Sequence, residues 1–161
     1  MAYQPTEATI LPQNFADTST VANAPLGTIR RGQDPVYGEG EFIYLRGVAS
    51  TAVGDLVVYD QRSGVATTRA VAGSRGPCAV AMSANVANQF GWYQISGAAV
   101  VNSNTAVANA SVYVTATPGQ VDDAVVATDK VDGARYKTAS GTPSAGFAVL
   151  QLSRPALNGN G

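Results

Sequence analysis

The sequence contains no histidine, and this absence removes a large group of catalytic and metal-binding chemistries. Histidine is the side chain that titrates near neutral pH, a common metal ligand and the usual activator of serine and cysteine nucleophiles. Only carboxylate or lysine chemistry remains. We therefore predict that the chain is not an enzyme and that it uses no cofactor.

Cysteine is also scarce, since Cys78 is the only one among 161 residues. One cysteine can form no intrachain disulfide and cannot build a thiolate zinc site, which excludes a disulfide-stapled secreted scaffold. Cys78 stands in the apolar run Cys78–Ala81. This setting is more typical of a small core residue than of a nucleophile.

Charged residues make up only 13% of the chain, against about 25% in an average soluble domain. The net charge is −1, which argues against nucleic-acid binding because that requires a basic face. The chain instead uses many small and uncharged residues: alanine, threonine, serine, asparagine and glycine. Two interpretations fit this composition: other chains cover much of the surface, or the protein forms an extracellular coat. We favour coverage by partner chains.

Long hydrophobic runs are missing as well. Nowhere do about 18 consecutive apolar residues occur, so we predict no transmembrane helix and no membrane partner. The first residues, Met1–Pro5, lack the basic start and apolar stretch of a signal peptide. We therefore expect synthesis in the cytoplasm.

From about residue 28 onward, short β-branched and aromatic runs alternate with glycine, proline, asparagine and aspartate. This pattern is typical of successive strands, and no sustained helical period interrupts it. We predict an all-β domain over residues 28–161, a small sandwich or barrel of short antiparallel strands. Strands are expected near residues 41–48, 55–59, 65–70, 77–83, 90–96, 98–101, 111–116, 135–138 and 145–152.

Residues 1–27 show neither helical nor strand periodicity, and their three prolines exclude a continuous helix. A disordered tail is one interpretation. Scattered apolar residues favour another, an extended arm laid along a neighbouring subunit. The arm residues predicted to make this contact are Ile10, Leu11, Phe15 and Val21.

The strand expected at residues 90–96 is apolar on both faces, although a strand with one solvent-exposed face should alternate apolar and polar residues. Phe90 and Trp92 lie on one face, Tyr93 and Ile95 on the other. We predict that a subunit interface covers the second face and assign Phe90, Trp92 and Tyr93 to core or interface. A curled barrel that hides both faces is the alternative.

Two groups of carboxylates remain as candidates for chemistry. Four aspartates cluster between residues 122 and 132 and could bind Ca²⁺, but their spacing does not fit an EF-hand loop, so a solvated loop is favoured. Glu39 and Glu41 could be imagined as a glycosidase pair, yet two acids two residues apart are common. The aspartates are Asp122, Asp123, Asp129 and Asp132.

Several stretches resemble the small head decoration (cement) proteins of tailed bacteriophages. The first is Gly47–Asp60, which reads as a strand-turn-strand opening. The likeness continues over Gly76–Asn85, Gln89–Val101 and Val112–Val121 and covers roughly residues 26–152. It consists of small-residue strands and glycine turns rather than of an invariant motif.

The resemblance implies a β-domain on the outer surface of a capsid, in a virion whose major capsid protein it contacts. It also implies association with copies of itself, as a trimer or a dimer, and no catalytic residues. Two alternatives stay open. One is a glycan- or receptor-binding β module, which needs exposed aromatic rings. The other is a different minor head or tail protein.

Overall fold

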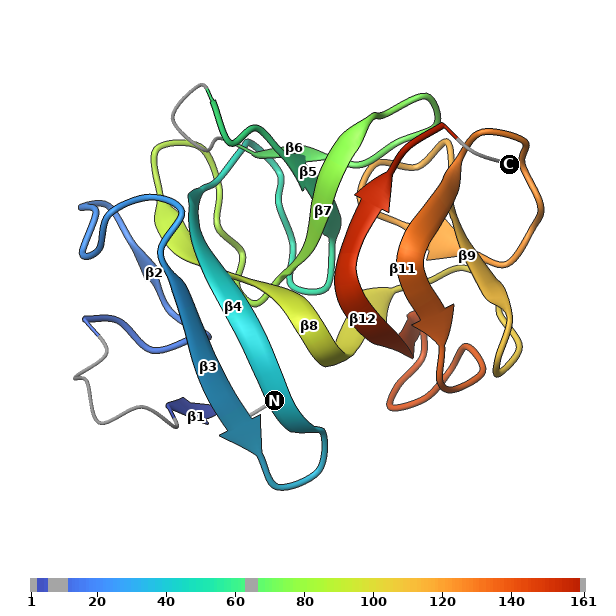
Figure 1. The fold of residues 1–161 in the computed structure, drawn as a ribbon, viewed down its shortest axis with the longest axis horizontal. Coiled ribbons are helices and arrows are strands. Elements are labelled where there is room, and N and C mark those ends of the chain that lie inside the picture. The colour runs from blue at the N-terminus through green and yellow to red at the C-terminus, as the bar shows by residue number, and fades with distance from the viewer. Residues whose placement is uncertain (1–2, 6–11, 63–66, 160–161) are drawn as a thin grey trace.

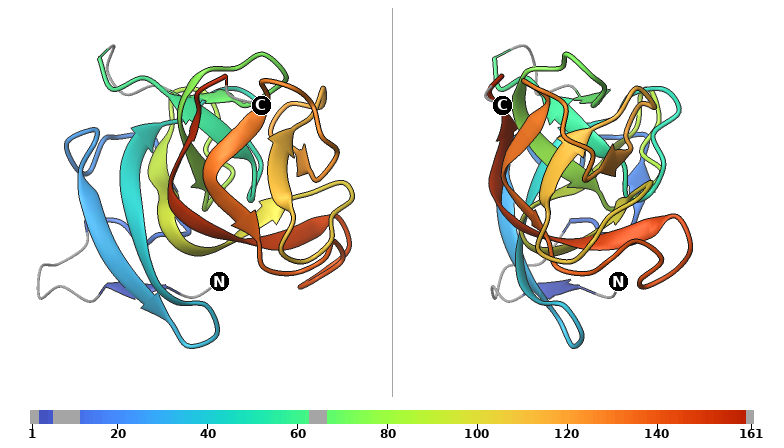
Figure 2. Two further views of the ribbon diagram at one scale, coloured as in Figure 1. Left: turned by 45° about the vertical axis from the view of Figure 1, so that its right-hand side comes forward. Right: turned by 90° about the vertical axis from the view of Figure 1, so that its right-hand side faces the viewer.

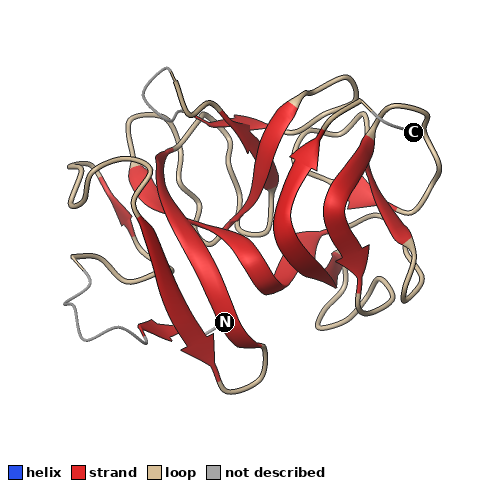
Figure 3. Cartoon of the chain, viewed as in Figure 1, coloured by secondary structure: helices blue, strands red, loops and turns tan. Residues whose placement is uncertain are grey.

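The computed structural model describes residues 3–5, 12–62 and 67–159, and within this part of the chain every regular element is a strand (Figures 1 and 3). All these strands join one sheet, ordered β1-β3-β4-β8-β7-β12-β11-β9-β10 along its main path. Off this path, β2 pairs with β8, β5 pairs with β7, and β6 pairs with β5. The predicted all-β fold is confirmed. The strands are β1 (Gln4–Pro5), β2 (Thr18–Ser19), β3 (Ile29–Asp34), β4 (Gly38–Arg46), β5 (Leu56–Tyr59), β6 (Thr67–Arg69), β7 (Gly76–Ala81), β8 (Phe90–Asn102), β9 (Ser111–Val114), β10 (Val121–Asp122), β11 (Lys130–Tyr136) and β12 (Phe147–Leu157).

Strand β8 is the long central element, and it changes partner halfway along its 13 residues. Its first half pairs with β4 and its second half with β12, and the change falls at Ser96 and Gly97. Gly97 has a φ of +91°, and a Cβ there would lie 2.3 Å from the carbonyl oxygen of Glu39. The two strands expected at residues 90–96 and 98–101 are therefore one strand, bent where only glycine fits.

The sheet curls until its distant parts meet, as the turned views of Figure 2 show. The N–H of Leu56 donates to the carbonyl of Gly119 at 2.9 Å, and the N–H of Gly119 donates to the carbonyl of Ala70 at 2.7 Å. These bonds connect the β5–β6 hairpin with the turn between β9 and β10. They enclose the main hydrophobic core, which includes Cys78 at 1% exposure and Leu150 at 0%.

Both faces of the first half of β8 are covered by the chain itself. Tyr93 and Ile95 join a second buried cluster with side chains of β4, β5 and β7, whereas Trp92 belongs to a third cluster on the opposite face. The prediction that a subunit interface covers the second face is wrong. The curled sheet supplies that cover instead, because side chains of β4, β5 and β7 pack against Tyr93 and Ile95.

The described part of the N-terminal segment lies against its own sheet. Strand β1 pairs with the outer edge of β3, and β2 pairs with the start of β8. Phe15 is 2% exposed, and its ring centroid lies 4.1 Å from that of Phe42 and 5.4 Å from that of Trp92. Residues 3–5 and 12–27 thus contact this chain, whereas the sequence predicted an arm along a neighbouring subunit. The apolar face of β4 and β8 supplies the surface on which this segment folds.

Candidate interaction surfaces

The residues predicted from the sequence to form an interface are divided between the interior and the surface. Phe15, Trp92 and Tyr93 are buried within the chain, with exposed fractions of 2%, 0% and 0%. Phe90 is half-buried, and Val21 is 67% exposed. Ile10 and Leu11 lie outside the described residues.

A buried glutamine organises the third cluster, and the sequence offered no signal for it. Gln13 accepts a hydrogen bond from the hydroxyl of Tyr44 at 2.8 Å and donates to the carbonyls of Asp17 and Phe90 at 2.7 and 3.0 Å. Its own carbonyl accepts the indole N–H of Trp92 at 3.0 Å. The ring of Trp92 is therefore packed inside the chain and its N–H is hydrogen-bonded there. It offers no exposed ring on which a sugar could stack.

Tyr3 anchors the start of the described chain. It is 6% exposed, donates from its hydroxyl to the carbonyl of Ala98 at 2.7 Å and accepts a hydrogen bond from Gln94 at 3.2 Å. Burial raises the pKa of Tyr3 to about 12, and the hydrogen bond from Gln94 partly opposes that rise. The ring packs edge-on against Phe42 at 4.8 Å between centroids.

The four aspartates of the 122–132 segment are spread out rather than gathered. Asp122 and Asp123 accept backbone N–H groups of Ala124 and Val107, and Asp129 accepts the N–H of Gly73 as well as Arg75. Asp132 accepts the side-chain amide of Asn158. In the described ranges, no three acidic or cysteine side chains stand close enough to hold a metal ion. Burial raises the pKa of Asp122, and the neighbouring Asp123 adds to this.

Glu39 and Glu41 project from the same side of β4. Arg31 lies 3.7 Å from Glu39 and 3.4 Å from Glu41, and Arg154 lies 3.2 Å from Glu41. The two carboxylates share one guanidinium and sit side by side on one strand. A glycosidase instead holds its two carboxyl groups on opposite sides of the scissile bond, so this geometry does not provide such a pair.

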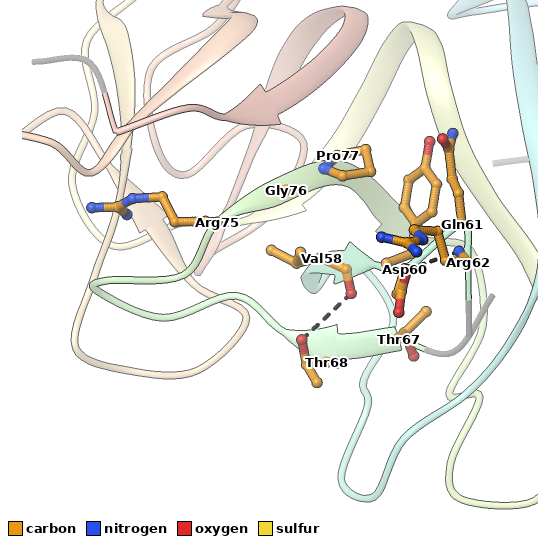
Figure 4. Close-up of a pocket in the computed structure, with 10 residues that line it drawn as sticks. Val58, Asp60, Gln61, Arg62, Thr67, Thr68, Arg75, Gly76 and Pro77 are labelled. Atoms are coloured by element: carbon orange, nitrogen blue, oxygen red, sulfur yellow. Dashed lines mark hydrogen bonds between the residues drawn. The ribbon is translucent and has the colours of Figure 1, made fainter. Parts of the chain in front are cut away.

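A groove of about 540 Å³, lined by a mixture of apolar and polar residues, lies at the end of the β5–β6 hairpin, beside the start of β7 (Figure 4). Arg75 stands at one end of the view, while Gln61 and Arg62 stand at the other. Thr68 donates from its hydroxyl to the carbonyl of Val58 at 3.5 Å across its floor. Among the described residues that line it, Asp60 is the one carboxylate, so the groove offers hydrogen-bond donors but no acid–base pair.

A second groove, here called the apolar groove, has a volume of about 360 Å³. It lies where the N-terminal segment, the β3–β4 hairpin, the β4–β5 loop and the loop before β12 approach one another. Val53 at its rim is 54% exposed, and Val36, next to the lining residue Tyr37, is 80% exposed. The described lining consists of apolar or aromatic residues: Ala16, Tyr37, Val53, Ala81, Met82, Val100 and Pro143.

The loop between β10 and β11 presents a run of exposed apolar residues, Ala124–Ala127, here called the valine loop. Val125 is 80% exposed and Val126 is 43% exposed, while Val107 on the adjacent β8–β9 loop is 63% exposed. The N–H of Val107 donates to Asp123 at 2.9 Å and joins the two loops. Sequence reasoning considered this segment for its aspartates and missed the four consecutive apolar residues between them.

The described residues include no helix long and apolar enough to cross a membrane. The chain matches none of the known family models against which it was compared, and no curated protein sequence matches it either.

Proposed function

We propose that this protein is a structural component of a phage virion, which decorates the outer surface of the capsid and stabilises it by bridging neighbouring major capsid protein subunits. The resemblance of residues 26–152 to head decoration proteins suggests this role. The all-β fold is compatible with it.

The observation that carries the proposal is the combination of two apolar surfaces with a chain of low charge. The valine loop and the apolar groove leave apolar side chains in water, and only 13% of residues are charged. Exposed apolar patches mark interaction sites. Contact area supplies the stabilisation, at about 25 cal/mol per Å² of apolar surface removed from water, repeated over many copies on a shell.

The proposal is tested by adding the purified chain to capsids that lack it, from the phage that carries its gene. We expect the chain to co-sediment with the shells at a saturating copy number and to raise the temperature at which they release DNA. Shells that neither bind the chain nor gain thermal stability, while binding their known partners normally, would overturn the proposal.

The predicted arm contact is tested in the same assay with a double substitution, Ile10→Ser and Leu11→Ser. Removal of residues 1–27 is unsuitable because it also takes Phe15 away from Trp92. If the arm binds the capsid, the double variant should bind capsids at least about tenfold more weakly. Its Trp92 fluorescence should be unchanged, which would show that the fold is intact. Tight binding by the double variant would exclude the arm as the gripping element.

A further inference from the structure

Two buried polar side chains in the loop between β7 and β8 have atoms that make no hydrogen bond to the chain. Ser83 is 3% exposed and Asn85 is 0% exposed. Within the part of the chain that the structure describes, the Ser83 hydroxyl and the carbonyl oxygen Oδ1 of Asn85 have no hydrogen-bond partner. Buried polar groups in folded proteins are rarely left in this state, so both atoms require an explanation.

Reversing the side-chain amide of Asn85 does not provide a partner. Its Nδ2 group donates to the hydroxyl of Tyr93 at 3.0 Å and to the carbonyl of Leu45 at 3.4 Å. In the reversed amide, the side-chain oxygen would face the carbonyl of Leu45, and two acceptors would repel each other. The NH₂ group would then take the position that has no partner. The amide therefore keeps its orientation, and Oδ1 needs a donor from elsewhere.

The two unpartnered side chains face the same point beside Gly91 in β8. A Cβ at Gly91 would lie 3.0 Å from the hydroxyl oxygen of Ser83 and 3.3 Å from Cγ of Asn85. It would also lie 3.3 Å from the carbonyl oxygen of Asp17. That carbonyl accepts the side-chain N–H of Gln13 at 2.7 Å, and a carbonyl oxygen has a second lone pair. Three polar groups thus converge where any residue other than glycine would place a side chain.

These three groups match the hydrogen-bonding capacity of one water molecule. Its two O–H groups can donate to Oδ1 of Asn85 and to the carbonyl of Asp17, and its oxygen can accept the hydroxyl proton of Ser83. Three hydrogen bonds are typical of a buried water. A cation such as Ca²⁺ takes about six to eight oxygen ligands, and none of the three groups carries a charge to balance it.

We infer that one water molecule is bound between Ser83, Asn85 and Asp17 as a fixed part of the folded protein. Asp17 directly precedes β2, which pairs with the start of β8. The water therefore links the N-terminal segment to the β7–β8 loop, beside the contacts that Gln13 and Phe15 make on the other face of β8.

The first experiment is a crystal structure of the full chain at a resolution that shows ordered water. We expect a density peak within about 2.5–3.0 Å of the three oxygen atoms. A second crystal soaked in Tl⁺, which substitutes for Na⁺ and K⁺, distinguishes a water from a monovalent cation. The site should give no anomalous signal from thallium.

The second experiment measures stability in solution, where the two possibilities predict opposite signs. If the Ser83 hydroxyl donates to a water, Ser83→Ala should lower the folding equilibrium constant about threefold to tenfold. If the hydroxyl is truly unpartnered, removing it should leave that constant unchanged or raise it, because burying a lone polar group costs free energy. Urea denaturation of both chains measures the ratio.

Ser103→Ala is the matched control, because Ser103 is 1% exposed and its hydroxyl bonds directly to the hydroxyl of Tyr136 at 3.0 Å. This variant should lose stability whether or not a water is bound at Ser83, which shows that the assay detects the loss of one buried hydrogen bond.

Three results would overturn the inference. They are a parent crystal with no density between the three oxygen atoms, a thallium signal at that position, and a Ser83→Ala variant at least as stable as the parent. Both experiments use the purified chain without capsids, so the outcome is independent of the proposed function.

Discussion

At the scale of single residues, Asp55 is a buried carboxylate that joins distant parts of the chain. It is 0% exposed and accepts hydrogen bonds from Arg69 at 2.7 Å, from the N–H of Ala52 at 2.9 Å and from Asn102 at 3.4 Å. A Cβ added to Gly119 would lie within 2.5 Å of its carboxyl carbon. The carboxylate therefore joins β6, the β4–β5 loop and β8 beneath the turn at residue 119.

Replacing Asp55 by alanine is expected to lower the free energy of unfolding by about 3–5 kcal/mol, because it leaves the partly buried Arg69 unpaired. Urea denaturation followed by circular dichroism measures the loss. Glu39→Gln is the control, since its side chain is 63% exposed and its ion pair with Arg31 spans 3.7 Å; that change should cost less than about 1 kcal/mol. Equal losses in the two variants would show that Asp55 does not hold these elements together.

Tyr3 gives a prediction for alkaline pH. Its pKa is raised from 10.0 to about 12 by burial, so the folded state retains the phenolic proton more tightly than the unfolded state. The resulting stability is fully present below pH 10 and is lost as the pH rises through 12. Above that range, the ionised phenol opposes burial of the N-terminal segment.

The Tyr3→Phe variant isolates this effect from the other tyrosines. At neutral pH it should be less stable than the parent by about 1 kcal/mol, because the hydroxyl bonds to Ala98 and Gln94 are lost. Between pH 10 and 12 the difference should shrink and then change sign, since only the parent carries the titrating group and a rise of its pKa to about 12 is worth more than about 1 kcal/mol. Thermal denaturation at stepped pH measures it, and a constant difference across that range would contradict the burial of Tyr3.

At the scale of elements, the bend in β8 depends on Gly97. Gly97 and Gly141 share a φ of +91°, but their surroundings differ. A Cβ at Gly97 would collide with the backbone of Glu39, whereas none of the atoms near Gly141 lies within 4 Å of the corresponding position. Alanine substitutions at the two positions therefore distinguish the cost of backbone strain alone from the added cost of a steric collision.

Gly141→Ala is expected to cost about 1–2 kcal/mol from the left-handed backbone alone. Gly97→Ala should cost about 2–5 kcal/mol, because forcing β4 and β8 apart adds to the same backbone strain. Chemical denaturation of both variants measures the difference. If the two losses were equal, β4 and β8 would not approach at Gly97 as closely as the structure indicates.

At the scale of the whole molecule, β8 takes part in all three hydrophobic clusters, with Ala99 in the main core, Tyr93 in the second and Trp92 in the third. The clusters cannot separate without breaking this strand. We therefore expect the described fold, including the N-terminal segment, to unfold as one unit.

Two residues that occur once in the sequence report on different clusters. Trp92 fluorescence reports on the third cluster, and the reactivity of the Cys78 thiol reports on the main core. Burial raises the pKa of Cys78 to about 12, so the native thiol should be almost inert to disulfide reagents at pH 8. The urea midpoints of the two signals should coincide. A lower midpoint for Trp92 would mean that the N-terminal segment unfolds separately.

The sequence alone was enough to predict the all-β class, the burial of Cys78 and most strand positions, because alternation, β-branched residues and glycine turns are local signals. Strand β3 escaped notice because Ile29–Asp34 is largely polar, and it becomes a strand by pairing with β1 and β4. The local pattern of apolar and polar residues carries no signal for pairing with a distant strand.

What covers each apolar face was decided only by the tertiary structure. The sequence showed that Trp92 and Tyr93 point to opposite sides of one strand, but a partner chain and the chain's own curled sheet satisfy that pattern equally well. The bend at Gly97, the folding of Phe15 onto Trp92 and the meeting of Leu56 with Gly119 are contacts between residues distant in sequence. These contacts bury Phe15, Trp92 and Tyr93, three of the residues predicted to form an interface, whereas Val21 stays exposed. The valine loop and the apolar groove are exposed apolar surfaces that the sequence did not single out.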